Sequence, residues 1–168
     1  MITRLLDIEV SHLDLLRWGV GQGADWVLVL EDDAMANDLV DCAEGLAALV
    51  ALGGSMPKYV NVSESFSLAE LGIDHLVRPV EGVGWAGSSD RMVLSADRPV
   101  TNTVCAILYR ASFANELLAT MEALPSEPVV PIDWKLNLAL MELFSSGSLP
   151  AGSCWLVEPA PIVQMSMR

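Results

Sequence analysis

The sequence predicts an α/β fold in which a mostly parallel mixed sheet lies between two layers of helices. Residues 26–30 are five apolar residues in a row, which is typical of a strand buried on both faces. A helical pattern follows this run, and residues 58–62 are then predicted to form a second strand. Because a strand, a helix and a strand in succession form a βαβ unit, we expect strand 26–30 to be central and parallel to strand 58–62.

The composition is that of a globular domain with a sizeable core. The chain has 168 residues, of which 52% are hydrophobic and 18% are charged. We therefore expect residues 1–168 to form one domain. The formal net charge of −13 argues against nucleic acid or an anionic membrane surface as a partner. A phosphate-bearing substrate would need a metal ion to offset this charge.

The cysteines and the lack of long apolar segments predict a soluble cytoplasmic protein without a transmembrane segment. Cys42, Cys105 and Cys154 are odd in number and have no CxxC spacing, which favours free thiols in a reducing compartment. No secretory signal is expected, because Asp7 and Glu9 interrupt the apolar residues of the N-terminus. The most apolar helical stretch, residues 39–52, is too short to cross a bilayer. The sequence is compatible with a homo-oligomer.

One helix is predicted before the first strand in the chain, and another after it. Before it, apolar residues recur at helical spacing until glycines end the helix: Val10, Leu13, Leu16, Val20, Gly21 and Gly23. After it, Asn37 or Asp38 can cap a second helix. The apolar stripe of that helix consists of Leu39, Ala43, Leu46 and Val50.

The middle of the chain has weaker periodicity. Residues 76–77 and 92–94 could form short strands, and a glycine-rich segment, residues 80–90, lies between them. This segment has neither the GxGxxG order nor a P-loop lysine, so it does not predict a phosphate-binding loop. Trp85 within it is either a mobile lid aromatic that stacks on a sugar or a loop tryptophan packed onto the surface.

Strands and helices are also predicted in the last third of the chain. Residues 104–108 form another buried strand, and Ser112 can cap the helix that follows. Asp133 opens a helix that is apolar nearly all round, which predicts that this helix is buried. A last short strand is expected around residues 155–157.

The residues best suited to chemistry are Glu31, Asp32 and Asp33, directly after strand 26–30. In open α/β sheets, ligands bind beyond the carboxyl ends of such strands. Three adjacent carboxylates repel one another and lose solvation, so they need a cation, a raised pKa or free access to water. Hard oxygen ligands favour Mg²⁺ or Mn²⁺, and such an ion can hold a diphosphate. An exposed acidic turn after a core strand is the alternative.

Five landmarks in order resemble glycosyltransferase family 25, the lipooligosaccharide galactosyltransferase-like group. Each motif alone is weak, but their order and rough spacing agree over nearly the whole chain. They are Ser11-His12 in the first helix, the strand ending in Glu-Asp-Asp-Ala at residues 27–34, strand 101–110 with helix 113–121, Pro131-Ile132-Asp133, and the closing residues 158–164.

This resemblance implies a GT-A-like (Rossmann-like) fold and an inverting, metal-dependent enzyme. Such an enzyme moves a hexose from a nucleotide-sugar donor to a glycan or other hydroxyl acceptor, as in lipopolysaccharide biosynthesis. The resemblance implies that Asp33 and Glu31 hold Mn²⁺ or Mg²⁺ and that Asp32 binds the donor. The other implied donor-binding residues are Ser11, His12, Thr101 and Asn102. Trp85 is the candidate for the lid on the acceptor side.

Asp133 falls where inverting enzymes of the GT-A fold carry the catalytic base. That base takes the proton of the acceptor hydroxyl as the hydroxyl oxygen attacks the anomeric carbon. A plain helix N-cap is the alternative role for this residue. Basic residues that could help to bind phosphates are few, and the candidates are Arg17, Arg78, Arg91 and Lys135.

The chain departs from the family pattern at its start. Family members have a strand–helix–strand unit before the Ser-His helix, and that unit grips the nucleotide base. Only ten residues precede Ser11 here, so the expected fold is N-terminally truncated. A non-catalytic remnant of the fold that binds a sugar or a partner protein is therefore the main alternative.

A second alternative is a signalling domain. The run from Val27 to Asp33 also resembles the first strand of a response-regulator receiver, where paired acids bind Mg²⁺ beside a phosphorylated aspartate. A receiver needs that aspartate at the end of its third strand. The strand after the second helix here leads to Ser63-Glu64-Ser65 instead, without an Asp-x-x-x-Pro turn.

Overall fold

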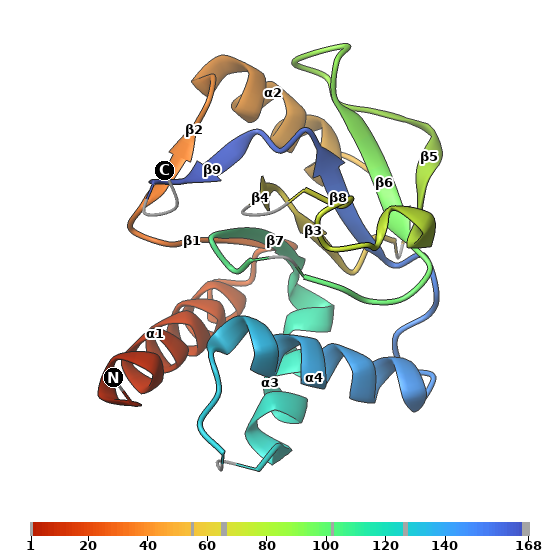
Figure 1. The fold of residues 1–168 in the computed structure, drawn as a ribbon. Coiled ribbons are helices and arrows are strands. Elements are labelled where there is room, and N and C mark those ends of the chain that lie inside the picture. Colours follow the sequence, from red (N-terminus) through yellow and green to blue (C-terminus); the bar gives the residue numbers. More distant parts are fainter. Residues whose placement is uncertain (1, 55, 65–66, 102, 126–127, 166–168) are drawn as a thin grey trace.

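The structure is a computed structural model of the chain, and it describes all residues except 1, 55, 65–66, 102, 126–127 and 166–168. The described part is an α/β fold (Figure 1). Its elements in chain order are α1 (Ile2–Gly21), β1 (Trp26–Leu30), β2 (Ala34–Ala36), α2 (Leu39–Val50), β3 (Tyr59–Asn61), β4 (Ser63–Glu64), the 3₁₀ turn η1 (Asp74–Leu76), β5 (Val77–Gly84), β6 (Met92–Ala96), β7 (Ala106–Arg110), α3 (Ala111–Ala123), α4 (Ile132–Ser145), β8 (Cys154–Glu158) and β9 (Ile162–Gln164).

Two sheets organise these strands. The larger has six strands in the order β1-β7-β3-β8-β6-β5, and the smaller has the order β2-β9-β4. Within the six-stranded sheet, β3 and β8 form the one parallel pair among the described strands, and the other pairs are antiparallel. The sheet is therefore mixed, as expected, but the prediction that it is mostly parallel is wrong. A GT-A-like fold stays a prediction.

The strand β1 is not central. It lies at an edge of the six-stranded sheet, and β7 separates it from β3. Since β1 and β3 are each antiparallel to β7, they run in the same direction without being neighbours. The sequence correctly indicated their common direction but gave no sign that a strand about fifty residues further along would insert between them. The antiparallel neighbour of β1 also contradicts the receiver alternative, which requires a parallel doubly wound sheet.

Burial of β1 is one-sided. Val27 and Val29 are buried in the core beneath the sheet, whereas the side chains of Leu28 and Leu30 are 36% and 46% exposed. The predicted burial on both faces is thus wrong for this strand. An apolar run without alternation cannot reveal this difference, because leucine and valine fit an exposed edge as well as a core.

Apolar cores on the two faces of the sheet give the molecule three layers. Figure 1 shows α1, α3 and α4 together on one face, and α2 with the small sheet on the other. The first core joins those three helices to β1, β3 and β7, with Phe113, Leu117 and Leu140 among its fully buried side chains. The second core joins α2 to β3, β7 and β8, with Val60 and Cys105 at its centre. This layering agrees with the expected three-layer arrangement.

Helix starts agree with the sequence only in part. The side chain of Asp38 accepts hydrogen bonds from two amides of the first turn of α2, which confirms the predicted cap. Helix α3 starts one residue before Ser112, and its N-cap Arg110 makes no side-chain cap bond, so the predicted Ser112 cap is wrong. Pro131 is the N-cap of α4, and Asp133 lies inside the first turn. The N-cap alternative for Asp133 is therefore wrong as well.

Helix α4 is buried on one face only. Its opposite face exposes Trp134 by 64%, Leu138 by 55% and Met141 by 40%. The prediction of a helix buried all round is wrong, because α4 packs on α1 and α3 from one side while these three side chains on the other stay exposed. Within the described ranges, none of the helices is both long enough and apolar enough to cross a membrane.

Candidate functional site

A pocket of about 570 Å³ lies between α1 and the carboxyl end of β1. Strands β1, β3 and β8 run in the same direction, so their carboxyl ends reach the same edge of the sheet. This is where the rule for open α/β sheets places ligands. The pocket is lined by Arg4, Asp7, Ile8, Ser11, His12, Leu15, Val29, Leu30, Glu31, Asp32, Asp33 and Gln164.

Helix α1 supplies one wall of the pocket through a single face. Arg4, Ile8, Ser11 and Leu15 follow one another at steps of four, three and four residues, which places them along one side of an α-helix. Among the described residues of this lining, Arg4 is the only arginine or lysine. Arg4 was not predicted as a site residue from the sequence, although its helical spacing to Ser11 was a signal that could have identified it.

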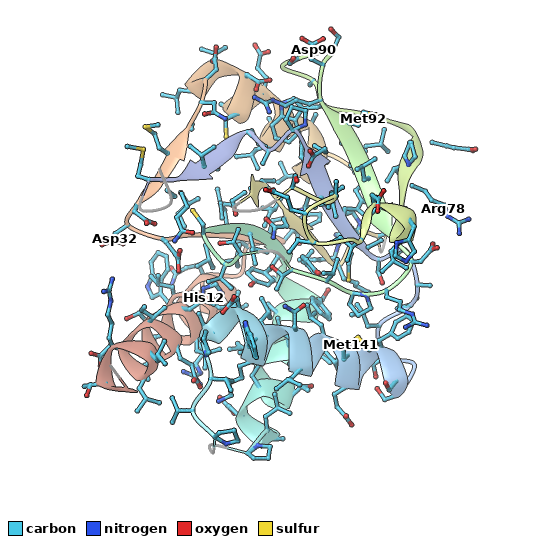
Figure 2. All side chains as sticks on the ribbon, viewed as in Figure 1. His12, Asp32, Arg78, Asp90, Met92 and Met141 are labelled. Carbon is cyan, nitrogen blue, oxygen red and sulfur yellow. The ribbon has the colours of Figure 1, made fainter. Side chains whose placement is uncertain are left out.

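The acidic residues form a tight turn at the end of β1. The amide of Ala34 donates a hydrogen bond to the carbonyl of Glu31 over 3.2 Å, so that Asp32 and Asp33 occupy the corner. Asp32 is exposed and lies at the rim of the molecule in Figure 2, whereas Asp33 is only partly exposed. Asp33 is fixed through its carbonyl, which accepts a hydrogen bond from the amide of Met165 over 3.0 Å.

One carboxylate oxygen in this turn is buried without a partner. The Oδ1 atom of Asp33 has no hydrogen-bond partner among the described residues, although it is shielded from solvent. The side chain of Glu31 has one hydrogen-bond partner among the described residues, the neutral Gln164, whose Nε2 donates to Glu31 Oε2 over 3.1 Å. Buried carboxylate oxygens are normally satisfied, so the orphaned atom marks a position where a cation or a hydrogen-bond donor would be stabilised.

Cys105 lies directly behind these acids. The amide of Glu31 donates to the carbonyl of Cys105 over 2.9 Å and extends the β1–β7 ladder by one residue beyond the pair Leu30–Ala106. Residues opposite each other in a ladder have neighbouring side chains. One ligand atom from each of Glu31, Asp33 and Cys105 lies within 4.8 Å of the other two. The sequence analysis treated Cys105 only as a core residue.

The electrostatic interactions among the carboxylates of the acidic turn are unfavourable. Burial raises the pKa of Glu31, and the negative charges of Asp33, Asp32 and Asp133 raise it further. The contribution of Asp133 places that residue within electrostatic reach of the turn, although it does not line the pocket. Burial, together with Glu31 and Asp33, raises the pKa of Cys105 to about 12, so the free thiol is protonated at neutral pH.

His12 and Ser11 both line the pocket, but they differ in their exposure to solvent. Ser11 is exposed on the wall, whereas His12 is 5% exposed and lies between α1 and the sheet (Figure 2). The Nε2 atom of His12 lies 3.1 Å from the Oη atom of Tyr109, with the two rings edge to face. Burial lowers the pKa of His12 to about 4, so this imidazole is neutral at physiological pH and cannot serve as a cation for phosphate.

Thr101 is not brought to the pocket. Its side chain is buried in a polar network in which its hydroxyl donates to the carbonyl of Thr103 and accepts from Asn61 Nδ2. Both roles of the hydroxyl are therefore used inside the protein. Asn102, the other donor-binding residue expected in this segment, lies outside the described residues. The segment supports the start of α4, because Asn137 bonds to the backbone of Thr101 at both its amide and its carbonyl.

Trp85 is an interior anchor and not a lid. Its side chain is 4% exposed, and its Nε1 donates to Asp41 Oδ1 over 2.8 Å. The indole packs so closely on α2 that a Cβ atom at Gly45 would lie 1.9 Å from the ring. Asp41 also accepts from Arg91 Nε over 2.7 Å. Of the two roles left open for Trp85, the mobile lid disagrees with the structure, and the packed tryptophan agrees only in part, because Trp85 packs in the interior and not on the surface.

The predicted phosphate-binding residues are engaged elsewhere. Each is held in an ion pair outside the pocket, in the pairs Arg17–Asp14, Arg17–Glu122, Arg78–Asp97, Arg91–Asp41 and Lys135–Glu9. Arg4 has no ion-pair partner in the part of the chain that the structure describes. It is therefore the residue of the pocket best placed to meet a phosphate.

Comparisons with known proteins do not identify a family. No protein-family model matches the sequence, and no curated protein is significantly similar to it. The resemblance to family 25 thus depends on the motifs alone. The pocket itself combines oxygen ligands with an unsatisfied buried atom, a single cation and apolar walls, and this donor set fits a divalent cation with a phosphate-bearing ligand.

Proposed function

We propose that the protein is an inverting glycosyltransferase that moves a hexose from a nucleotide-sugar donor to a hydroxyl of a glycan or other acceptor. The observation that carries this proposal is the orphaned Oδ1 of Asp33, buried beside Glu31 at the wall of the pocket. A divalent cation is a suitable partner for that atom, because it would also offset the burial and the repulsion that raise the pKa of Glu31.

Glu31 and Asp33 would hold this cation, Mn²⁺ or Mg²⁺. When bound, it would neutralise the charge that grows on the diphosphate as the bond to the sugar breaks. Arg4 on the opposite wall would add a second positive charge for the phosphates. The exposed Asp32 would accept hydrogen bonds from ribose hydroxyls, and the apolar side chains of Ile8 and Leu15 would contact the less polar parts of the donor.

Asp133 would act as the general base. Its carboxylate takes the proton of the acceptor hydroxyl while the oxygen bonds to the anomeric carbon and the diphosphate leaves with the bonding electrons. Three observations support this role. Asp133 is partly exposed, it has no capping duty in α4, and it lies within electrostatic reach of Glu31.

A non-catalytic sugar- or protein-binding module is the second candidate. Two observations favour it: β1 lies at an edge of the six-stranded sheet, and Arg4 is the single arginine or lysine among the described residues of the pocket lining. A module of this kind would bind its ligand without turning it over.

Calorimetry with a panel of nucleoside diphosphates, with and without Mn²⁺, tests the proposed function. Wild-type protein should bind one of them more tightly in the presence of Mn²⁺, and Asp33→Asn should remove this gain. Asp97→Asn, which alters an exposed acid paired with Arg78, is the matched control and should behave as wild type. Equal binding by wild type and Asp33→Asn would refute the metal-dependent donor site.

Sugar transfer separates the two candidates. If Asp133 is the base, Asp133→Asn should keep Mn²⁺-dependent diphosphate binding and lose transfer by ~10² or more. Donor binding without any transfer by the wild type, over a panel of acceptors, would favour the binding module. Transfer at the wild-type rate by Asp133→Asn would remove Asp133 from the mechanism.

A further inference from the structure

We propose that Cys105 is a third ligand of the cation site, so that the site prefers thiophilic divalent cations such as Zn²⁺, Co²⁺ or Cd²⁺ over Mg²⁺. The inference rests on the proposed function of Glu31 and Asp33 as metal ligands and deepens it. It makes the site a mixed one, with carboxylate oxygens on the pocket side and a sulfur atom on the inner side.

The first argument is geometric. Glu31 and Cys105 are held opposite each other by the backbone hydrogen bond that extends the β1–β7 ladder, and the turn after β1 brings Asp33 back towards them. The three potential ligand atoms lie within 4.8 Å of one another, so a single ion placed among them can reach all three. The two acids line the pocket, which leaves the remaining coordination positions open to solvent or to a diphosphate.

The second argument is that one of these potential ligand atoms has no hydrogen-bond partner. Asp33 Oδ1 is shielded from solvent and unbonded among the described residues, although a buried carboxylate oxygen without a hydrogen bond is costly. Cys105 is 0% exposed, so its sulfur faces the acids from the interior of the protein. An ion bound between these groups would coordinate Asp33 Oδ1, the buried atom without a hydrogen bond.

The third argument is the chemistry of the donor atoms. Carboxylate oxygens alone suit Mg²⁺ and Mn²⁺, whereas thiolates favour softer ions. Coordination replaces the thiol proton, which is released to solvent, and a metal-bound cysteine is present as the thiolate. Adding one sulfur to two carboxylates therefore shifts the preference of the site away from Mg²⁺.

The chain contains its own matched controls. Cys42 and Cys154 are also free and buried, at 4% and 2% exposure. Cys154 hydrogen-bonds with Tyr59, as Cys105 does with Ser63, but neither Cys42 nor Cys154 belongs to a candidate group of metal-ligating side chains within the described residues. A property of buried cysteines in general should appear in all three, whereas a ligand property should belong to Cys105 alone.

Titration of the whole protein with Co²⁺ tests the inference, because a thiolate bound to Co²⁺ gives an intense near-ultraviolet charge-transfer band and carboxylates do not. We expect this band in wild type, Cys42→Ser and Cys154→Ser, and its loss in Cys105→Ser. Competition between Zn²⁺ and Mg²⁺ should show a preference for Zn²⁺ that falls by ~10-fold or more in Cys105→Ser, since even the loss of an outer-shell partner costs that much. Circular dichroism identifies variants that fail to fold, and Cys105→Ala provides a second substitution.

The outcomes also separate this inference from the proposed function. A band that persists in folded Cys105→Ser, or its absence from metal-loaded wild type, overturns the role of Cys105. Donor binding that depends on Asp33 but not on Cys105 would leave the transferase proposal intact and refute the third ligand. A Cys105-dependent band without diphosphate binding would support the mixed site and count against the transferase.

Discussion

Asp41 and Asp33 are two aspartates whose carboxylates have opposite surroundings. Both oxygens of Asp41 are bonded, one to Trp85 Nε1 over 2.8 Å and one to Arg91 Nε over 2.7 Å. Asp33 has an orphaned buried oxygen and acidic neighbours. The first arrangement is closed and holds the β5–β6 hairpin against α2. The second is open towards a pocket.

This difference teaches how a structural acid can be told from a candidate functional one. Burial alone does not separate them, because Asp41 is the more buried of the two. What separates them is whether the protein itself supplies the countercharge. Arg91 does so for Asp41, whereas Glu31 adds a second negative charge beside Asp33. Unbalanced charge at a pocket is typical of sites that bind or react.

The largest expected effect on stability comes from removing the carboxylate of Asp41. Asp41→Ala leaves the Nε of Arg91 and the indole N–H of Trp85 without these partners in a poorly solvated place, since the two charged side chains of the pair are only 9% and 12% exposed. The Nη1 atom of Arg91 keeps its hydrogen bond to the carbonyl of Pro159. We expect a loss of ~3–5 kcal/mol in the free energy of unfolding, measured with urea. Asp97→Ala, in an exposed pair with Arg78, should cost ~1 kcal/mol or less. Equal costs for the two variants would contradict the comparison.

The next largest effect is expected at His12. This residue lines the open pocket, but its side chain is buried against Tyr109. Its pKa falls from the ordinary 6.5 to about 4 on folding, so the native state binds fewer protons than the unfolded state between these values. The stability from neutral His12 is complete above pH 6.5, and roughly 3 kcal/mol of it is lost as the pH falls towards 4. Urea unfolding at several pH values should show a smaller acid loss for His12→Gln. The same acid loss in both proteins would show that His12 does not titrate in this way.

A smaller effect of opposite sign is expected at Glu31. Its folded pKa is raised, so the stability associated with its protonated form is present below its ordinary pKa and is lost as the pH rises through the raised value. In metal-free protein at pH 7, Glu31→Gln should therefore stabilise by an amount on the order of 1 kcal/mol, the scale of one repulsion near a surface. Thermal unfolding with excess EDTA measures this gain, and adding Mn²⁺ should reverse the order of the two proteins. A destabilised metal-free Glu31→Gln would show that the turn is not under repulsion.

The smallest effect concerns Asp133, and it distinguishes a first-turn charge from a cap. An acid in the first turn of α4 interacts favourably with the helix dipole, which is worth ~0.3–1 kcal/mol. Asn and Ala both remove that charge, so Asp133→Asn and Asp133→Ala should cost equally. An N-cap would instead tolerate Asn and lose ~1 kcal/mol with Ala. Chemical unfolding of the two variants side by side decides between these patterns.

Local features of the fold could be predicted from the sequence. The helix periodicity identified α1 and α2, and the hydrogen-bonding capacity of Asp38 identified a cap. The acidic residues were correctly placed at the end of a strand, because an apolar run followed by acids is visible over eight residues. Such features depend on neighbours in the chain, and their physics is contained in a short window.

Features that depend on distant pairing could not be predicted. Nothing near residue 26 indicates that β7 will pair with β1, and this pairing is what brings Cys105 behind Glu31. In the same way, Asp41 and Asp33 look alike in the sequence, since the countercharge of Asp41 comes from Arg91, fifty residues away. Trp134 in α4 was expected to be buried because an apolar sequence does not reveal which side of a helix lacks a neighbour.

The edge position of β1 has a consequence for the protein in solution. Glu31 and Asp25 bond to the β7 side, so by alternation the amides of Leu28 and Leu30 point away from the sheet, where the described chain has no further strand. This edge is apolar and has no lysine, proline or bulge, the usual devices that stop strands of different molecules from pairing. Mutual repulsion from the net charge of −13, together with the acidic residues that flank the strand on both sides, Asp25 and residues 31–33, opposes such pairing. When acid removes that charge, we expect aggregation to begin by edge-to-edge growth from β1.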